Sequence, residues 1–231
     1  MVCIDIAHGD SQQCVEMIQW LRNNHSELFI IAGNVATGSG AKRLWRAGAN
    51  VVKVGVGPGS LCTTRIETGN GVPQLTALMD VAEAQRELMA LYKTKDNPEL
   101  AKRQFPFISD GGIKDAGDIV KALCFADMVM IGNMFAGCEE APGHVINIDG
   151  RSYKEYVGSS THKANHIEGV AAIVPYKGSV DKILLKLTEG LQSGCSYQGA
   201  HNLSALKDNP VFIRITGAGL KESHPHDVIV R

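Results

Sequence analysis

The sequence Gly55-Val56-Gly57-Pro58-Gly59-Ser60-Leu61-Cys62-Thr63-Thr64-Arg65 is the most informative stretch of this chain. It follows an apolar run at residues 50–54, which is typical of a buried parallel strand. Glycines at alternate positions let the backbone turn sharply and approach a ligand closely. A lone cysteine is often only a small buried side chain. Loops after the carboxyl ends of parallel strands, however, carry the chemistry of α/β enzymes, so this cysteine is a candidate nucleophile.

The composition is that of a globular protein with an ample core. Of 231 residues, 44% are hydrophobic and 20% are charged, and the formal net charge is −1. Without a basic tract, nucleic acid is not an expected partner. No apolar run reaches the length of a membrane span, so we expect no membrane partner. The six cysteines are scattered with no CxxC pair. This indicates a reducing cytoplasm rather than a disulfide framework or a structural zinc site.

Strand, loop and helix patterns alternate along the first part of the chain. Each expected strand ends in glycine or a polar residue, and helical spacing follows. This order predicts a parallel α/β architecture, and short strands interrupted by glycine favour a (β/α) barrel over an open doubly wound sheet. No Gly-x-Gly-x-x-Gly follows the first strand, which disfavours a Rossmann domain. The expected strands are residues 2–7, 28–32, 51–54, 105–109 and 128–131, and the expected helices are residues 11–24, 38–47, 74–92 and 118–123.

The pattern changes from residue 149 onward. Asp149 and Gly150 predict a hairpin turn, and residues 149–178 form a lid or flap region. Its polar middle is either a solvated loop or a mobile lid beside a catalytic face. For the polar tail, simple disorder is the alternative. The remaining expected segments are two helices at residues 180–192 and 199–207, a surface insertion at residues 93–104 and the tail at residues 217–231.

Several strings resemble the family of IMP dehydrogenases and GMP reductases. The resemblance runs nearly end to end and implies a (β/α)8 TIM barrel. Only five strand units precede the lid, whereas a closed barrel needs eight strands. The chain thus resembles the C-terminal part of one catalytic barrel domain, residues 1–231; a compact five-strand unit that folds differently is the alternative. The matching strings are residues 4–9, 32–37, 53–65, 71–75, 109–113, 130–132, 153–160, 168–169, 174–178 and 218–228.

The resemblance implies roles for individual side chains. Cys62 stands where the family's cysteine thiolate attacks carbon 2 of the purine to form a covalent intermediate. Thr64 and Glu168 stand where the family has a proton relay, and Asp110 stands where the ribose hydroxyls are held. Asn133 replaces the serine or glycine usual at its position. The other substrate-binding positions are Ser60, Gly111, Gly112, Gly132, Asn133 and Tyr156 around the phosphate, Ser159 and Ser160 along the purine edge, and Gly158.

The resemblance also implies a cofactor, a cation and an assembly. The cofactor is NADPH or NAD, and the substrate is a purine mononucleotide. Backbone carbonyls suit a large monovalent cation, and the family's dehydrogenases bind potassium in this way. The expected oligomer is a cytoplasmic homotetramer whose tail reaches a neighbouring subunit. The cofactor positions are Asp5, Asn34 and Gly55, and the potassium positions are Gly57, Gly59 and Cys62 with Glu222, Ser223 and His224 of a neighbour.

The lid favours one of the family's two activities. The family's dehydrogenases hydrolyse the covalent intermediate with an adjacent Arg-Tyr pair on a long flap. Here residues 161–167 alone separate Ser160 from Glu168, and they contain no Arg-Tyr pair. Residues 153–159 also resemble bacterial GMP reductases, whereas the tail resembles bacterial dehydrogenases. We favour a GMP reductase, which converts GMP and NADPH to IMP and ammonia. The alternative is an IMP dehydrogenase, which converts IMP, NAD and water to XMP.

A hypothesis of another class is an inactive fragment or regulatory module that binds nucleotide without turnover. Such a chain would keep the phosphate-binding loops and assemble through its tail. The complete set of Cys62, Thr64 and Glu168 favours an enzyme instead.

Overall fold

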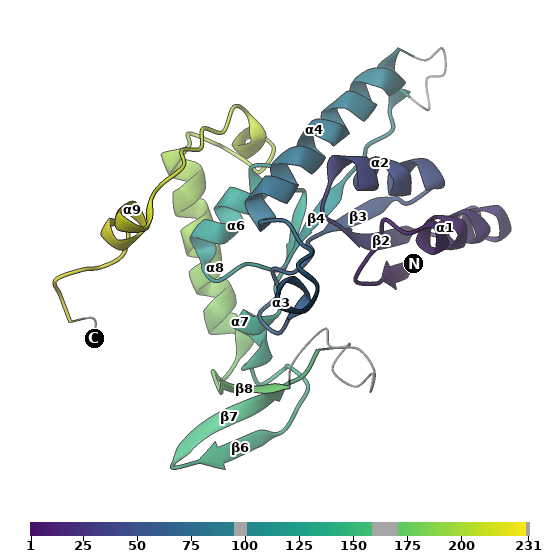
Figure 1. Cartoon of the computed structure of the whole chain (residues 1–231). Helices are drawn as coiled ribbons and strands as arrows, with labels where there is room; N and C mark the ends of the chain where they lie inside the picture. Colours follow the sequence, from purple (N-terminus) through teal and green to yellow (C-terminus); the bar gives the residue numbers. More distant parts are fainter. Residues whose placement is uncertain (95–100, 159–170, 230–231) are drawn as a thin grey trace.

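The computed structural model describes residues 1–94, 101–158 and 171–229 (Figure 1). Its centre is a five-stranded parallel sheet whose strands lie in the order in which they follow one another along the chain. A doubly wound sheet reverses its strand order near the middle, and this sheet does not. The strands are β1 (Val2–Asp5), β2 (Ile30–Val35), β3 (Val51–Val54), β4 (Phe107–Asp110) and β5 (Met128–Met130).

The helices that alternate with these strands, and α8 after them, form a row on one face of the sheet. α1 contacts α2, α2 contacts α4, α4 contacts α6, and α6 contacts α8. Such a row is expected when every strand–helix–strand crossover has the same hand. The arrangement is that of a partial TIM barrel, which confirms the predicted fold class. The helices are α1 (Gln12–Asn24), α2 (Gly38–Ala47), α4 (Gln74–Lys93), α6 (Ala116–Leu123) and α8 (Val180–Tyr197).

The core lies between the sheet and this row of helices. Alternate residues of the strands face the helices, because successive side chains of a strand point to opposite faces. Trp45 of α2 is fully buried there and makes edge-on ring contacts with Phe105 and Phe107. Side chains that cap the helices fix where they begin, as Ser11 does at α1 and Thr37 at α2. The opposite face of the sheet carries the polar side chains described below.

Several predicted strand boundaries and one predicted helix were wrong; β1, for example, ends at Asp5 rather than at residue 7. β2 was expected to end before Gly33 but continues through it to Val35. Gly33 does not end the strand; it leaves room for the side chain of Lys53, whose Cβ would lie 2.7 Å from a Cβ at Gly33. β4 includes Asp110, which was expected to follow the strand. The helix expected at residues 199–207 is only the 3₁₀ turn η1 (Ala205–Lys207), since Gly199 turns the backbone at φ 64° after α8 ends.

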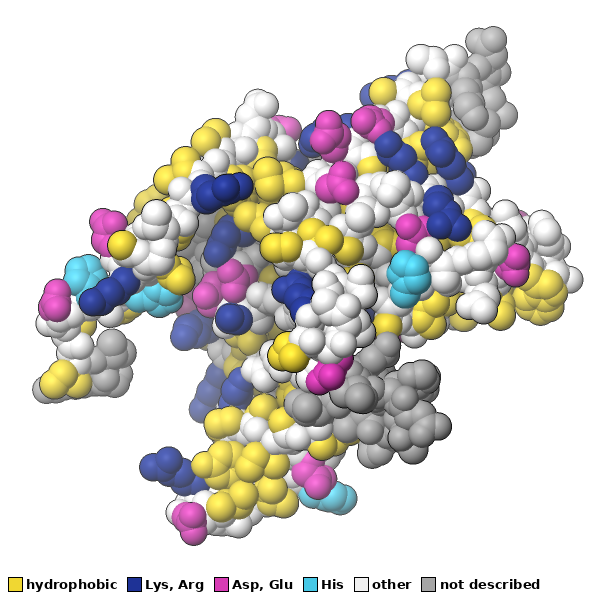
Figure 2. All heavy atoms as spheres, in the orientation of Figure 1, with side chains coloured by type: hydrophobic (Ala, Val, Ile, Leu, Met, Phe, Trp, Pro, Cys, Tyr) yellow, Lys and Arg dark blue, Asp and Glu magenta, His cyan; other side chains and the backbone are white. Residues whose placement is uncertain are grey.

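A second, antiparallel sheet follows the parallel one. It contains β6 (Val145–Ile148), β7 (Arg151–Tyr156) and β8 (Ala172–Pro175) in that order. The predicted hairpin turn is confirmed: Asp149 and Gly150 join β6 to β7 with φ of 50° and 77°. The described part of the expected lid region is therefore largely this sheet, and residues 159–170 lie outside the described part. Hydrophobic side chains gather on its exposed surface (Figure 2).

The tail is not simply disordered, because it contains the short helix α9 (Gly217–Glu222), which lies away from the parallel sheet (Figure 1). It is also less polar in character than expected, since Leu220 and Val228 expose 52% and 68% of their surface. The short helices α3 (Thr64–Thr68) and α7 (Asn133–Ala136) were not predicted. In the part of the chain that the structure describes, none of the helices is both long and apolar enough to cross a membrane.

Candidate active site

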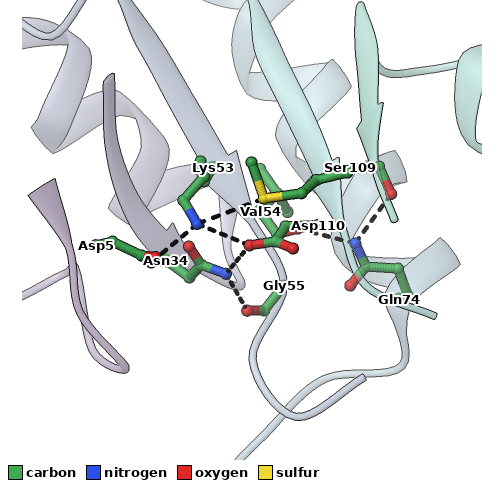
Figure 3. Close-up of polar contacts among 9 residues, drawn as sticks. Asp5, Asn34, Lys53, Val54, Gly55, Gln74, Ser109 and Asp110 are labelled. Atoms are coloured by element: carbon green, nitrogen blue, oxygen red, sulfur yellow. Dashed lines mark hydrogen bonds and ion pairs between the residues drawn. The ribbon is translucent and has the colours of Figure 1, made fainter. Parts of the chain in front are cut away.

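A buried lysine organises the face of the parallel sheet opposite the helices. Lys53 lies in β3, is 1% exposed, and donates hydrogen bonds from Nζ to Asp5 Oδ1 at 2.9 Å and to Asp110 Oδ2 at 2.8 Å (Figure 3). The two carboxylates come from the carboxyl ends of β1 and β4. Strand order and register thus bring together side chains that are far apart in the sequence.

The lysine remains charged in this setting. Burial lowers the pKa of Lys53, but hydrogen bonds and the negative charges of Asp110 and Asp5 outweigh it, so the pKa lies above the usual lysine value. The side chain of Asp110 is 21% exposed, whereas that of Asp5 is 61% exposed. The ion pair with Asp110 is therefore the better shielded from water.

Asn34, at the carboxyl end of β2, extends this cluster. Its Nδ2 donates to the carbonyl oxygen of Gly55 at 2.8 Å and to Asp110 Oδ2 at 3.0 Å. Its Oδ1 is buried and has no hydrogen-bond partner among the described residues. A buried acceptor without a partner is costly unless a ligand or water pairs with it. Asn34 thus presents a ready acceptor for an N–H group.

The loop after β3 reaches the same cluster because its first residue is glycine. Gly55 has φ of 150°, and a Cβ there would lie 2.2 Å from the carbonyl oxygen of Asp110. Gln74 supports the loop base by donating from Nε2 to the Val54 carbonyl at 2.8 Å and to Ser109 Oγ at 3.1 Å (Figure 3). Only a residue without a side chain permits this close passage of two strand ends.

Cys62 and Thr64 are brought together at the far end of this loop. Cys62 Sγ donates to Thr64 Oγ1 at 3.1 Å, and both residues are half-buried. The backbone N–H of Cys62 donates to the Gly59 carbonyl at 3.1 Å, which closes a turn just before α3. Arg65 holds the loop against the chain before α4, since its guanidinium donates to the carbonyl oxygens of Val56 and Val72.

The loop after β4 packs against the cysteine loop. A Cβ at Gly111 would lie 3.1 Å from Pro58 Cγ and 3.2 Å from the backbone nitrogen of Gly59. Gly112 is also next to Pro58. The two glycines predicted to bind phosphate therefore lie beside the loop that carries the cysteine. The Gly111 N–H already donates to the Met130 carbonyl at 3.2 Å.

The loop after β5 meets the antiparallel sheet. A Cβ at Gly132 would lie 2.7 Å from Tyr156 Oη. The phenol ring of Tyr156, in β7, therefore lies directly against Gly132. Burial raises the pKa of Tyr156, and the negative charge of Asp110 raises it further. The hydroxyl consequently stays protonated at neutral pH and can donate a hydrogen bond.

Some predicted site residues cannot be tested for contact. Glu168, Ser159 and Ser160 lie outside the described residues. The tail residues Glu222, Ser223 and His224 lie in and just after α9, away from α3 (Figure 1), so the structure does not bring them to the cysteine loop. Among the described residues, no group of three or more His, Cys, Asp or Glu side chains could hold a metal ion.

Sequence reasoning missed three supporting residues and misjudged one. No roles were assigned to Lys53, Arg65 and Gln74. The lysine inside the apolar run Val51-Val52-Lys53-Val54 indicates a buried charge, and a buried charge requires partners. Cys3 was expected to be a packing residue like the other remaining cysteines, but it is exposed. It lies on the side of β1 that faces away from the helices.

The fold and the site together define a class of protein. Side chains from the carboxyl ends of parallel strands converge beside a loop with a paired cysteine and threonine, which is where barrel-type α/β folds hold their ligands. The chain belongs to the IMP dehydrogenase / GMP reductase family: the family model described as "IMP dehydrogenase / GMP reductase domain" matches residues 1–226.

Named relatives and a solved structure agree with this assignment. The chain is 45% identical to inosine-5'-monophosphate dehydrogenase of Aquifex aeolicus, over 99% of this chain and 47% of that protein. It is 42% identical to the Bacillus subtilis protein of the same name, over 99% and 47%. A cysteine-to-alanine variant of GMP reductase from Trypanosoma brucei, in complex with guanosine 5'-monophosphate, matches with a TM-score of 0.86 and 39% identity, over 98% of this chain and 47% of that one. The chain thus spans about half the length of these proteins.

Proposed function

We propose that this chain carries the catalytic site of a GMP reductase, which converts GMP and NADPH to IMP, ammonia and NADP. The observation that carries the proposal is the lid sequence: residues 161–167 alone separate Ser160 from Glu168 and lack the Arg-Tyr pair with which the family's dehydrogenases activate water. A reductase needs no activated water. The structural likeness to the Trypanosoma brucei GMP reductase supports this choice.

The first step is attack by Cys62 on carbon 2 of GMP. The sulfur–carbon bond forms, the bond from carbon 2 to the exocyclic nitrogen breaks, and the thiol proton leaves with that nitrogen as ammonia. Cys62 Sγ lies 3.1 Å from Thr64 Oγ1, so the threonine hydroxyl can receive the thiol proton directly. We assign Glu168 as the next group of the relay to the leaving ammonia.

The second step restores the cysteine. A reduced nicotinamide held beside Asp5, Asn34 and Gly55 would supply the hydride that carbon 2 carries in IMP. The sulfur–carbon bond then breaks, and Cys62 leaves as a thiolate that takes up one proton. The sum is GMP, NADPH and one proton giving IMP, ammonia and NADP, so atoms and charge balance.

The remaining site residues bind and orient the nucleotide. Within the described residues, the hydrogen bonds to the Asp110 side chain all go to Oδ2, which leaves Oδ1 for the ribose hydroxyls. Backbone amides and hydroxyls suit a phosphate because they donate hydrogen bonds without adding net charge. We assign this role to Ser60, Gly111, Gly112, Gly132, Asn133 and Tyr156, with Gly158, Ser159 and Ser160 completing the substrate site.

The residues at the carboxyl ends of β1 to β3 fit a nicotinamide. The unpartnered Oδ1 of Asn34 would accept a hydrogen bond from the carboxamide N–H, next to Asp5 and Gly55. A potassium ion would be held by the carbonyls of Gly57, Gly59 and Cys62. The Gly59 oxygen accepts one hydrogen bond from the Cys62 N–H and keeps a second lone pair for a cation.

An IMP dehydrogenase is the second candidate. It is favoured by the names of the relatives that are 45% and 42% identical to this chain. In that case NAD replaces NADPH, and a base outside the lid activates water. For either activity we propose a homotetramer. We also propose a cytoplasmic location, which the six unpaired cysteines support.

The proposal is tested by measuring products of the purified full-length protein. With GMP and NADPH, chromatography should show IMP, and ammonia should equal the NADPH consumed. The Cys62→Ala variant serves as the control and should form neither product. Nucleotide binding without any ammonia or IMP from the unmodified protein would reject the reductase. Formation of XMP from IMP and NAD would then favour the dehydrogenase, and its absence would favour the non-catalytic module.

A further inference from the structure

Lys154 of β7 is a buried cation outside the cluster around Lys53. It is 2% exposed, and its Nζ donates to the backbone carbonyls of Cys138 at 2.8 Å, Glu139 at 3.2 Å and Ala141. Three acceptors match the three N–H donors of an ammonium group. In the described ranges of the chain, the ion pairs do not include Lys154. Its charge is thus satisfied by the main chain.

These carbonyls belong to the segment directly after α7. Gly132 lies directly before α7, so residues 132–141 form one continuous segment with α7 in its middle. The other end of this segment meets the same strand, because Tyr156 Oη lies against Gly132. Lys154 and Tyr156 are two residues apart in β7, so their side chains point to the same face of the strand. β7 therefore contacts both ends of one segment.

A second lysine also contacts α7 but is exposed. Lys177, after β8, donates from its side-chain Nζ to the Met134 carbonyl at 3.0 Å. Its backbone N–H donates to the Gly137 carbonyl at 2.8 Å. Water can replace an exposed donor, whereas it cannot easily replace a buried one. The two lysines thus bind carbonyls of the same segment, residues 132–141, and differ in burial.

We propose that Lys154 is a positioning residue that fixes β7 on the segment 132–141 so that the Tyr156 hydroxyl meets the nucleotide phosphate beside Gly132. The inference rests on the proposed function, in which Tyr156 contacts the phosphate. Without the ammonium, three carbonyls lose their buried donor, the one of Cys138 in a buried place, and β7 no longer has one fixed position on this segment. Tyr156 then loses its place although its own side chain is unchanged.

The test compares binding of GMP and guanosine to the full-length protein by calorimetry. In Lys154→Met the affinity for GMP should fall roughly tenfold, the value of one hydrogen bond to a charged group. The affinity for guanosine, which lacks the phosphate, should stay unchanged. Tyr156→Phe should show the same pattern. The double variant should be no weaker than either single variant, because both remove the same contact.

Two further variants make the test decisive. Lys177→Met is the matched control and should lower GMP affinity by less than about threefold, since its Nζ contact is exposed. Lys154→Gln, which keeps two N–H donors, replaces Lys154→Met if that variant does not fold. Unchanged GMP affinity, or equal losses for GMP and guanosine, would overturn the positioning role while leaving the proposed function intact. An unaffected Tyr156→Phe variant would instead overturn the phosphate assignment itself, and the inference with it.

Discussion

Replacing Lys53 by methionine removes the cation that joins the ends of β1, β3 and β4. Nζ lies 2.8 Å from Asp110 Oδ2 and 2.9 Å from Asp5 Oδ1. The Asp5 side chain is 61% exposed, so water replaces its partner at little cost. The Asp110 side chain is 21% exposed, and losing one charged hydrogen bond there costs about 1.5–3 kcal/mol. Relief of the lysine's own desolvation offsets part of this, so we expect a loss of about 2 kcal/mol.

The assay is urea unfolding of the full-length protein, followed by circular dichroism at several pH values. Because folding raises the pKa of Lys53, its contribution is fully present below the ordinary value of 10.5 and is lost as the pH rises through the raised value. The difference between wild type and Lys53→Met should therefore be constant from about pH 6 to about pH 9. Lys121→Met removes an exposed ion pair to Asp118 and should cost less than about 0.5 kcal/mol. A Lys53→Met loss no larger than this control, or one that vanishes within that pH range, would refute the reasoning.

Two further substitutions test the loop after β3. Cys62→Ala should abolish turnover, because the thiol forms the covalent bond. Its affinity for GMP, measured by calorimetry, should stay within about threefold of wild type. Full activity of this variant would exclude the covalent mechanism. Gly55→Ala should lower the free energy of unfolding by more than about 2 kcal/mol, since its Cβ would lie 2.2 Å from the Asp110 carbonyl. Gly217→Ala, where nothing lies within 4 Å, is the matched control, and equal losses for the two would contradict this reading.

Local pattern was enough to predict the parallel part of the fold. The buried run at β3 and the helical spacing of α2 and α4 depend on neighbouring residues, and these elements were placed within one residue of their observed ends. Glycine was harder to interpret, because it can end a strand or leave room for another chain segment. Gly33 leaves room for Lys53, which lies in another strand. The local sequence around Gly33 does not contain this contact.

The candidate site was predicted only in part. Cys62 and Thr64 are neighbours in one loop, so their pairing follows from the local sequence. The convergence of Asp5 and Asp110 on Lys53, and of Asn34 on Asp110, depends on register between four strands, which no local pattern contains. The contact of Tyr156 with Gly132 depends on how an antiparallel sheet packs beside a parallel one. Such contacts come from tertiary packing, and the resemblance alone placed these residues together.

The central claim is that the site reduces GMP rather than oxidising IMP. Absorbance of reduced nicotinamide tests it most directly, with purified full-length protein in two cuvettes. One contains GMP and NADPH, and the other contains IMP, NAD and potassium. The account predicts that absorbance falls in the first cuvette and stays constant in the second. A rise in the second with no change in the first would contradict it and would make the protein a dehydrogenase.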